Sequence, residues 1–190
     1  MNNRGSQQHP HASSGPPQHA QRSPHNPSKG GAGESGGQNT AKRIEQRLRD
    51  PARIIYFDKP TEPNAKPAPR KELFDKEAET LAKKLAGIPA SQLRRFYTGV
   101  RAIKRQLDLD PNLGIDFIKA ELALLKARSA YALARLDYRA DDQKDPDQLL
   151  TLLVRHGNSI EDRKSFNAFV RHFEAIMAYH KVFEEKRANR

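Results

Sequence analysis

Large apolar side chains recur at intervals of three and four residues through most of the chain after residue 70. This spacing places them on one face of a helix and therefore predicts five amphipathic helices. The helices are predicted over residues 71–86, 91–107, 113–138 and 146–156, and from Ser159 onward. No strand-like alternation of useful length occurs there, so the sequence predicts an all-α fold, a five-helix bundle.

Capping residues predict where several of these helices begin and end. Ser91 is expected to cap the second helix, because a serine oxygen accepts the free N–H groups of a first turn. Asp145, followed by a proline, is expected to open the fourth helix, and Gly157 is expected to end it. Ser159 together with Asp162 approximates a capping box for the fifth helix.

The first 70 residues have a different pattern. Residues 1–40 are dominated by Gly, Pro, Ser, Gln, Asn and His, so they bury too little apolar surface to fold and are predicted to form a disordered basic tail. Residues 41–70 are predicted to be a stiff proline-rich linker with a helical turn or two near its start. Its apolar patch, residues 54–57, is expected to be an anchor or a short strand. The helical domain is predicted to span residues 71–190.

The charge of the chain favours an anionic partner. It has 34 Lys and Arg residues against 23 Asp and Glu, a net charge of +11. Residues 1–70 hold 11 basic and 5 acidic residues, so a net +5 remains in the helical part. Such an excess suits RNA or DNA first and an anionic membrane surface second. The chain has no cysteine and no apolar run long enough to span a bilayer, so it is expected to be a soluble cytoplasmic protein.

Arginine side chains form rows along two of the predicted helices. The rows are Arg94, Arg101 and Arg105 on the second helix, and Arg128, Arg135 and Arg139 on the third. At about 100° per residue, the members of each row lie within roughly 40° of one another. A guanidinium donates two hydrogen bonds to a phosphate, so such rows suit a nucleic-acid backbone. Equally, they suit solvated helix faces paired with nearby carboxylates.

Residues that could carry catalysis or bind a metal show no recognisable arrangement. No phosphate-cradling glycine loop, zinc spacing or nucleophile motif occurs. The acidic residues are mostly caps, loop residues or exposed helix positions, so no carboxylate pair is expected to converge. His180 lies in the apolar stripe of the fifth helix, where a histidine is more often a hydrogen-bonded core residue than a ligand. The sequence therefore predicts a protein that is not an enzyme and has no metal or cofactor.

Three segments, taken in order, resemble a known family. They are residues 91–97 (Ser-Gln-Leu-Arg-Arg-Phe-Tyr), residues 125–132 (Leu-Lys-Ala-Arg-Ser-Ala-Tyr-Ala) followed by Arg135, and residues 169–181 (Phe-Val-Arg-His-Phe-Glu-Ala-Ile-Met-Ala-Tyr-His-Lys). Their order and separation resemble the small subunit of type III-A CRISPR effector complexes, the Csm small-subunit family. The likeness covers about residues 71–190 and does not account for the N-terminal 70 residues.

The resemblance implies a non-catalytic helical subunit that serves in antiviral defence. Such a subunit would stack head-to-tail with like subunits, join the other effector subunits, and contact the guide RNA and the target RNA. Basic positions carried over by motif are Arg94, Arg95, Lys126, Arg128 and Arg135, to which the rows add Arg101, Arg105 and Arg139. Tyr131 and His180 are expected to be structural, in the core or in a subunit interface.

Two functions of other classes also fit the sequence. In a helical DNA-binding regulator, residues 87–90 would form the turn between two helices. Against this reading, the second helix has a continuous apolar stripe and few Asn or Gln residues to read bases. In a basic protein scaffold, the arginine rows would meet acidic protein surfaces, and partner binding would be insensitive to ribonuclease.

Overall fold

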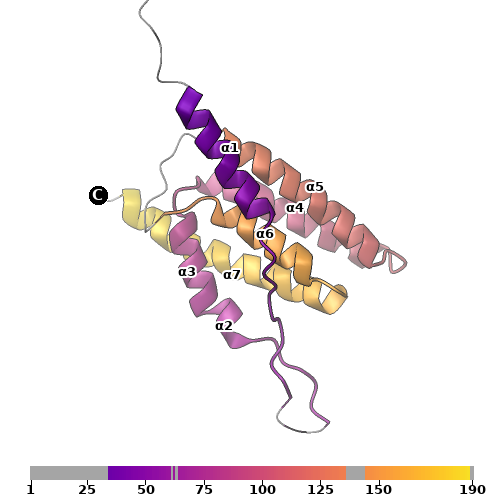
Figure 1. Ribbon diagram of the computed structural model, residues 1–190. Coiled ribbons are helices and arrows are strands. Elements are labelled where there is room, and N and C mark those ends of the chain that lie inside the picture. Colours follow the sequence, from indigo (N-terminus) through magenta and orange to yellow (C-terminus); the bar gives the residue numbers. More distant parts are fainter. Residues whose placement is uncertain (1–33, 61, 63, 136–143, 189–190) are drawn as a thin grey trace, which may run out of the picture. The chain divides into compact units, whose positions relative to one another are not determined.

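The computed structural model describes residues 34–60, 62, 64–135 and 144–188 of the chain. These residues form seven α-helices and no β-strand, which confirms the all-α prediction, although the bundle was predicted to have five helices. The helices are α1 (Glu34–Leu48), α2 (Lys71–Phe74), α3 (Lys76–Leu85), α4 (Ala90–Leu109), α5 (Ile115–Ala134), α6 (Gln148–Ser159) and α7 (Arg163–Ala188) (Figure 1).

The helix α7 provides the centre of the core. It packs against α2, α3 and α4, and its aromatic stripe places Phe166, Phe169 and Phe173 fully out of solvent. Adjacent rings of this stripe meet edge to face, with centroids 6.1 and 6.0 Å apart. Burying one such side chain stabilises the fold by about 2–3 kcal/mol. The aromatic stripe seen in the sequence is therefore the heart of the bundle.

The first two helices of the predicted domain differ from the prediction: the first is interrupted, and the second begins earlier. The helix expected over 71–86 is interrupted at Asp75, whose φ of −114° and ψ of −102° separate α2 from α3. Asp75 accepts a hydrogen bond from the Tyr179 hydroxyl of α7 at 3.4 Å, so a tertiary contact lies at the break. Ser91 does not cap α4, because that helix begins one residue earlier, after Pro89. The fixed φ of a proline suits this position.

The caps around the last two helices also differ from those predicted. The helix α6 continues through Gly157 and ends at Ser159. The capping box is formed by Asp162 and Ser165, not by Ser159 and Asp162. Asp162 Oδ1 accepts the Ser165 backbone N–H at 2.7 Å, and Ser165 Oγ accepts the Asp162 N–H at 3.0 Å. The Ser165 N–H lowers the pKa of the Asp162 carboxyl, because it stabilises the charged form.

Residues before the predicted domain start pack onto the bundle. The helix α1 contacts α5 and α6, and its Ile44 is buried. Arg43 forms an ion pair with Asp147, and Arg47 donates to Asp145 at 2.6 Å. The compact unit accordingly begins at Gly33. Residues 34–40, which composition predicted to be disordered, belong to α1, whereas residues 1–33 of the predicted tail lie outside the described residues.

Asp145 does not open α6, as the sequence predicted. The helix begins at Gln148, and Asp145 lies in the preceding turn, where its carbonyl accepts the Gln148 N–H at 3.0 Å. The Asp145 carboxylate is instead engaged by Arg47 of α1 and by the Gln148 side chain at 2.8 Å. The start of α6 is thus also the docking point for α1.

The apolar patch 54–57 is an anchor, one of the two roles expected for it. Tyr56 is only 4% exposed, and its neighbour Phe57 forms a single antiparallel bridge with Pro69. The bridge closes the proline-rich loop, since Arg70 N–H donates to Tyr56 O at 2.9 Å and Asp58 N–H to Ala68 O at 3.0 Å.

Replacing Asp147 by alanine is expected to lower the free energy of unfolding by about 2–3 kcal/mol. The Asp147 side chain is fully buried, and its loss would leave the Arg43 guanidinium, 27% exposed, without its carboxylate. Urea denaturation followed by circular dichroism measures the change. The matched control is Glu45→Ala, which removes the exposed partner of Arg49 and should cost less than about 0.5 kcal/mol. Equal losses in both variants would show that the α1 contact contributes no more than a surface pair.

Candidate nucleic-acid interface

The core packing of α4 determines which of its side chains reach the solvent. Leu93, Phe96, Val100, Ile103 and Leu107 form the buried stripe. Arg94, Arg95, Arg101 and Arg105 consequently lie on the exposed part of the helix. In the described part of the chain, Arg94, Arg95 and Arg105 form no ion pair, whereas Lys104 pairs with Asp108 at 2.8 Å. These three arginines are therefore not neutralised by carboxylates of the described residues, as the alternative reading of the rows supposed.

The structure divides the arginines of α4 between two surfaces. Arg101 and Arg105 line a shallow hollow along one side of the helix, together with Thr98 and Asp108. Arg101 also interacts with Tyr97, whose pKa is raised by partial burial and by the nearby Glu174 carboxylate. Arg95 faces the other side, toward α5. The row predicted on α4 is thus one flank of the helix, and Arg95 belongs to a different site.

A groove of about 680 Å³ runs between the first half of α4 and the second half of α5. Three of the predicted RNA-binding residues converge on it: Arg95 from α4, and Arg128 and Arg135 from α5. The groove is lined by Pro89, Ser91, Gln92, Arg95, Phe96, Gly99, Leu125, Arg128, Tyr131, Ala132 and Arg135. The two helices approach closely at its floor, where a Cβ on Gly99 would lie 2.9 Å from Leu125 Cδ1. The absence of a side chain at Gly99 therefore leaves room for Leu125 at this contact.

Tyr131 lies at the surface of this groove and not in the core of the described unit. Its side chain is 65% exposed. Arg135 Nη1 donates to the Tyr131 hydroxyl at 2.7 Å, and the guanidinium carbon lies 5.5 Å from the ring centroid. Of the two structural roles expected for Tyr131, this exposure excludes the core of the described unit, because Tyr131 lies on the side of α5 opposite its buried face. The other role, in a subunit interface, stays a prediction. His180, by contrast, is buried as predicted, with its Nε2 3.1 Å from Leu85 O.

The remaining predicted residues do not reach the groove. Lys126 is half-buried on the opposite flank of α5, where it lines a smaller hollow with Lys119 and with Val154 of α6. Arg94 is exposed on α4, outside the hollows described above. Arg139 lies outside the described residues. The groove therefore unites three of the eight candidates, and Arg101 and Arg105 form a second basic surface.

A family model described as Csm2 Type III-A matches residues 68–186, more than half of the chain. The chain belongs to the Csm2 family. Its members are structural small subunits of the multi-subunit type III-A CRISPR effector, so the resemblance seen in the three sequence segments is confirmed. No curated protein and no solved structure matches the chain.

The Csm2 match separates the helices of this chain into two groups. It covers α2 through α7, including both sides of the arginine groove. Its start at residue 68 lies close to the domain start predicted at residue 71. The helix α1 and the anchor Tyr56 precede it, so the contacts of Arg43 and Arg47 join an additional N-terminal segment to the Csm2 region. None of the described helices of this Csm2 chain has the length and apolarity needed to cross a bilayer.

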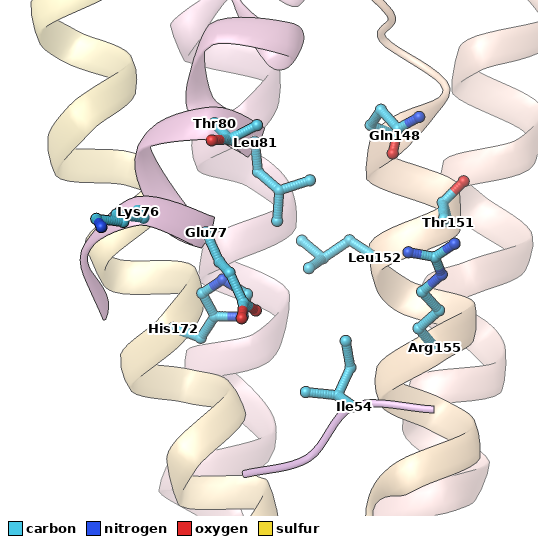
Figure 2. Close-up of a pocket in the computed structure, with 10 residues that line it drawn as sticks. All are labelled: Ile54, Lys76, Glu77, Thr80, Leu81, Gln148, Thr151, Leu152, Arg155 and His172. Atoms are coloured by element: carbon cyan, nitrogen blue, oxygen red, sulfur yellow. The ribbon is translucent and has the colours of Figure 1, made fainter. Parts of the chain in front are cut away.

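A cavity of about 380 Å³ in the Csm2 region lies between α3 and α6. Figure 2 shows Leu81 and Leu152 extending toward each other from the two helices, with Thr151 and Arg155 along the α6 side. His172 of α7 also lines the cavity, and its Nε2 has no hydrogen-bond partner among the described residues. Arg155 is held by Asp50 at 2.9 Å, so its charge is compensated.

Two buried histidines form a hydrogen-bonded chain that sequence reasoning missed. The Tyr56 hydroxyl lies 2.6 Å from His156 Nδ1, and His156 Nε2 lies 3.1 Å from His172 Nδ1. If the Tyr56 hydroxyl donates to His156 Nδ1, then His156 carries its proton on Nε2 and donates it to His172 Nδ1. His172 then carries its proton on Nε2, which faces the cavity. In this arrangement only that one donor is unpaired among the described residues. The one signal for these histidines in the sequence is that each lies in a predicted helix among apolar residues.

The histidine chain is neutral and structural. Burial lowers the pKa of His156 well below its usual value, with a further decrease from His172, and burial lowers the pKa of His172 to about 4. A general base needs a pKa near the working pH, and burial holds the pKa of both histidines below that range. Within the described residues, no group of three or more His, Asp or Glu side chains could hold a metal ion.

Proposed function

We propose that this Csm2 chain contacts the guide and target RNA of a type III-A effector through the groove between α4 and α5. The observation that carries the proposal is the convergence of Arg95, Arg128 and Arg135 on one groove, with Arg95 and Arg128 free of carboxylate partners among the described residues. Arginine keeps its charge at all physiological pH values and donates to phosphate in a bidentate fork. Charge complementarity therefore favours an RNA backbone over a neutral or basic partner.

The contact proposed is with the backbone and not with the bases. Guanidinium groups neutralise phosphates of any sequence, and contacts of this kind position a protein without specifying a sequence. The second basic surface, Arg101 and Arg105, lies on the same helix as Arg95 and would extend the contact along α4. Guide pairing would then supply the sequence specificity, and the subunit would hold RNA of any sequence.

Beyond RNA, we propose that the subunit stacks with like subunits and adjoins other effector subunits, as Csm2 membership supports. It is proposed to be non-catalytic, so that RNA cleavage belongs to other subunits. Membership of this family favours an effector subunit over the DNA-binding regulator and the protein scaffold that the sequence also allowed.

The proposed function is tested by measuring the affinity of the purified chain for fluorescently labelled single-stranded RNAs of about 30 nucleotides across a salt series. Three phosphate contacts predict a slope of log K against log salt of about −2. Two RNAs of unrelated sequence should bind within about threefold of each other, and both should remain intact in the presence of Mg²⁺. Binding that is insensitive to salt, or that differs more than about tenfold between sequences, would contradict backbone contact.

A further inference from the structure

The helix α5 is apolar on two opposite faces. Its inner face packs into the bundle through Ile118, Leu122, Leu125, Ser129 and Leu133, which are buried. Its outer face consists of Phe117, Ala120, Leu124, Ala127, Tyr131 and Ala134. On this outer face, Leu124 is 50% and Tyr131 65% exposed, whereas Phe117, at one end, is half-buried and also packs against the core. A surface helix of a monomer normally presents polar residues there, so the outer face of α5 is a contact surface without a partner in the described unit.

The outer face has the repeat of a helix-pairing seam. Its residues are separated alternately by three and four positions, which is the spacing of a coiled-coil stripe. Large side chains occupy the first position of each seven-residue repeat, at 117, 124 and 131. Alanines occupy the other position, at 120, 127 and 134. Such a seam suits a partner helix that offers small side chains opposite the large ones.

We propose that two copies of this chain pair through antiparallel α5 helices related by a two-fold axis between residues 124 and 127. In this register every large side chain faces an alanine of the second copy. Leu124 faces Ala127 at the centre, Tyr131 faces Ala120, and Phe117 faces Ala134 at the ends. The same sequence satisfies both copies, which is the requirement for an isologous interface.

Charges beside the seam agree with the same register. Glu121 and Arg128 lie on one flank of the outer face, and in the described residues neither forms an ion pair. In an antiparallel pair the residues on this flank face their own counterparts. The register therefore places Glu121 next to Arg128 of the second copy, and the two-fold axis repeats this ion pair. A parallel pairing of the same helices would lack it and would place large side chains against each other.

The proposed pair is a closed contact, so it cannot extend into a head-to-tail series of subunits. It also covers Tyr131 and engages Arg128, both of which line the arginine groove. If the proposed RNA contact is correct, RNA and a second copy compete for one side of α5. The paired form would then be a state of the free subunit, released when RNA fills the groove.

Cysteine trapping tests the register directly, because the chain has no cysteine of its own. Leu124→Cys and Ala127→Cys chains are purified separately, mixed and oxidised, and the disulfide-linked dimer is measured on a non-reducing gel. The mixture should give at least about five times more dimer than either chain alone, since only mixed pairs bring positions 124 and 127 together. Efficient linkage of the Leu124→Cys chain to itself would indicate parallel helices and overturn the proposal, as would the absence of linkage in the mixture.

Sedimentation analysis of charge variants tests the ion pairs. Glu121→Arg and Arg128→Glu should each weaken the dimer of the purified chain by at least about fivefold, because each brings like charges together twice. Mixing these two variants should restore the dimer, since the mixed pair regains both attractions. Failure of the mixture to associate better than either variant would overturn the antiparallel register.

A third variant tests the seam itself. Leu124→Glu should weaken the dimer by at least about tenfold, and the control Leu109→Glu, at an exposed leucine of α4, should not. A dimer that tolerates Leu124→Glu would overturn the proposal.

Adding RNA to the purified chain tests the competition, and it should lower the fraction of dimer. A dimer fraction that stays unchanged while RNA binds would overturn the competition. Absence of RNA binding would instead refute the proposed function.

Discussion

Replacing Arg95, Arg128 and Arg135 together by glutamate is expected to weaken RNA binding by about 100-fold or more at moderate salt. Each arginine is expected to contribute about 1 kcal/mol through a charge-assisted bond to phosphate, and three such losses correspond to a factor of about 100. The slope of log K against log salt should become shallower by about 2, because about three fewer phosphates of the single strand are neutralised on binding. Anisotropy titrations of the same labelled RNAs across a salt series measure both changes.

A matched control separates the groove from the overall charge of the protein. Lys59, Lys66 and Lys71 are exposed, form no ion pair in the described part of the chain, and lie outside the groove. Changing them to glutamate alters the net charge by the same amount. The control variant should lose less than about fivefold in affinity, through the weaker long-range field alone. Equal losses in the two triple variants would mean that RNA responds to net charge and not to the groove.

Lowering the pH from 7 to 5 is expected to reduce the free energy of unfolding by roughly 3 kcal/mol through His156 and His172. Both side chains are buried and have lowered pKa values in the folded protein, about 4 for His172. The unfolded chain binds their protons near pH 6.5, so it gains protons that the folded state excludes. The stability they contribute is therefore present above pH 6.5 and is lost as the pH falls toward 4. Urea denaturation at half-unit pH steps measures this slope.

The variant His172→Asn tests the origin of that slope. Asparagine does not titrate, so the decrease in the free energy of unfolding between pH 6.5 and pH 5 should be about half of that in the unchanged protein. This holds whatever the variant does to stability at pH 7. Tyr56→Phe is the complementary variant, because it removes the hydroxyl beside His156 without removing an imidazole. It should lower stability and leave most of the slope. An unchanged slope in His172→Asn would show that other groups cause the acid sensitivity.

The histidine chain also explains how the N-terminal segment is held. The buried Tyr56 hydroxyl lies 2.6 Å from His156 Nδ1, and the Ile54 N–H donates to Ser159 Oγ of the same helix, α6, at 2.5 Å. Arg43 and Arg47 hold α1 at the other end of α6. The segment from α1 to Tyr56, which precedes the Csm2 match, thus contacts the chain at both ends of α6. Removal of this segment would take away the hydroxyl partner of His156 Nδ1 and the Ile54 N–H donor of Ser159 Oγ, whereas Ser159 Oγ would keep its bond to Arg155 O.

Local sequence predicted most helices of the Csm2 region and which apolar side chains share a face. The three- and four-residue spacing identified the stripe of α4 from Leu93 to Leu107 and the phenylalanines of α7, because helical periodicity places these apolar side chains on one face, and the structure buries that face. It also placed the arginines of α4 and α5 on exposed flanks. The three motif segments identified the family. These features depend on residues close together in the chain.

Features that depend on distant residues required the tertiary structure. Spacing grouped Arg94 with Arg101 and Arg105, but the packing of α4 on α5 joined Arg95 to Arg128 and Arg135, because helix crossing decides which flanks meet. Composition alone did not identify α1 as part of the bundle, since its partners Asp145 and Asp147 lie about 100 residues further along the chain.

Periodicity predicted one amphipathic helix over residues 113–138, and Tyr131 was expected to lie in the core or in a subunit interface. Only the positions of the neighbouring helices showed how its apolar side chains divide, with Leu125 in the core and Leu124 and Tyr131 at the surface. A helix sequence fixes which side chains share a face. Which face is buried depends on the elements that pack against it, and for the outer face of α5 that element is absent from the described unit and is proposed here to be a second copy of the chain.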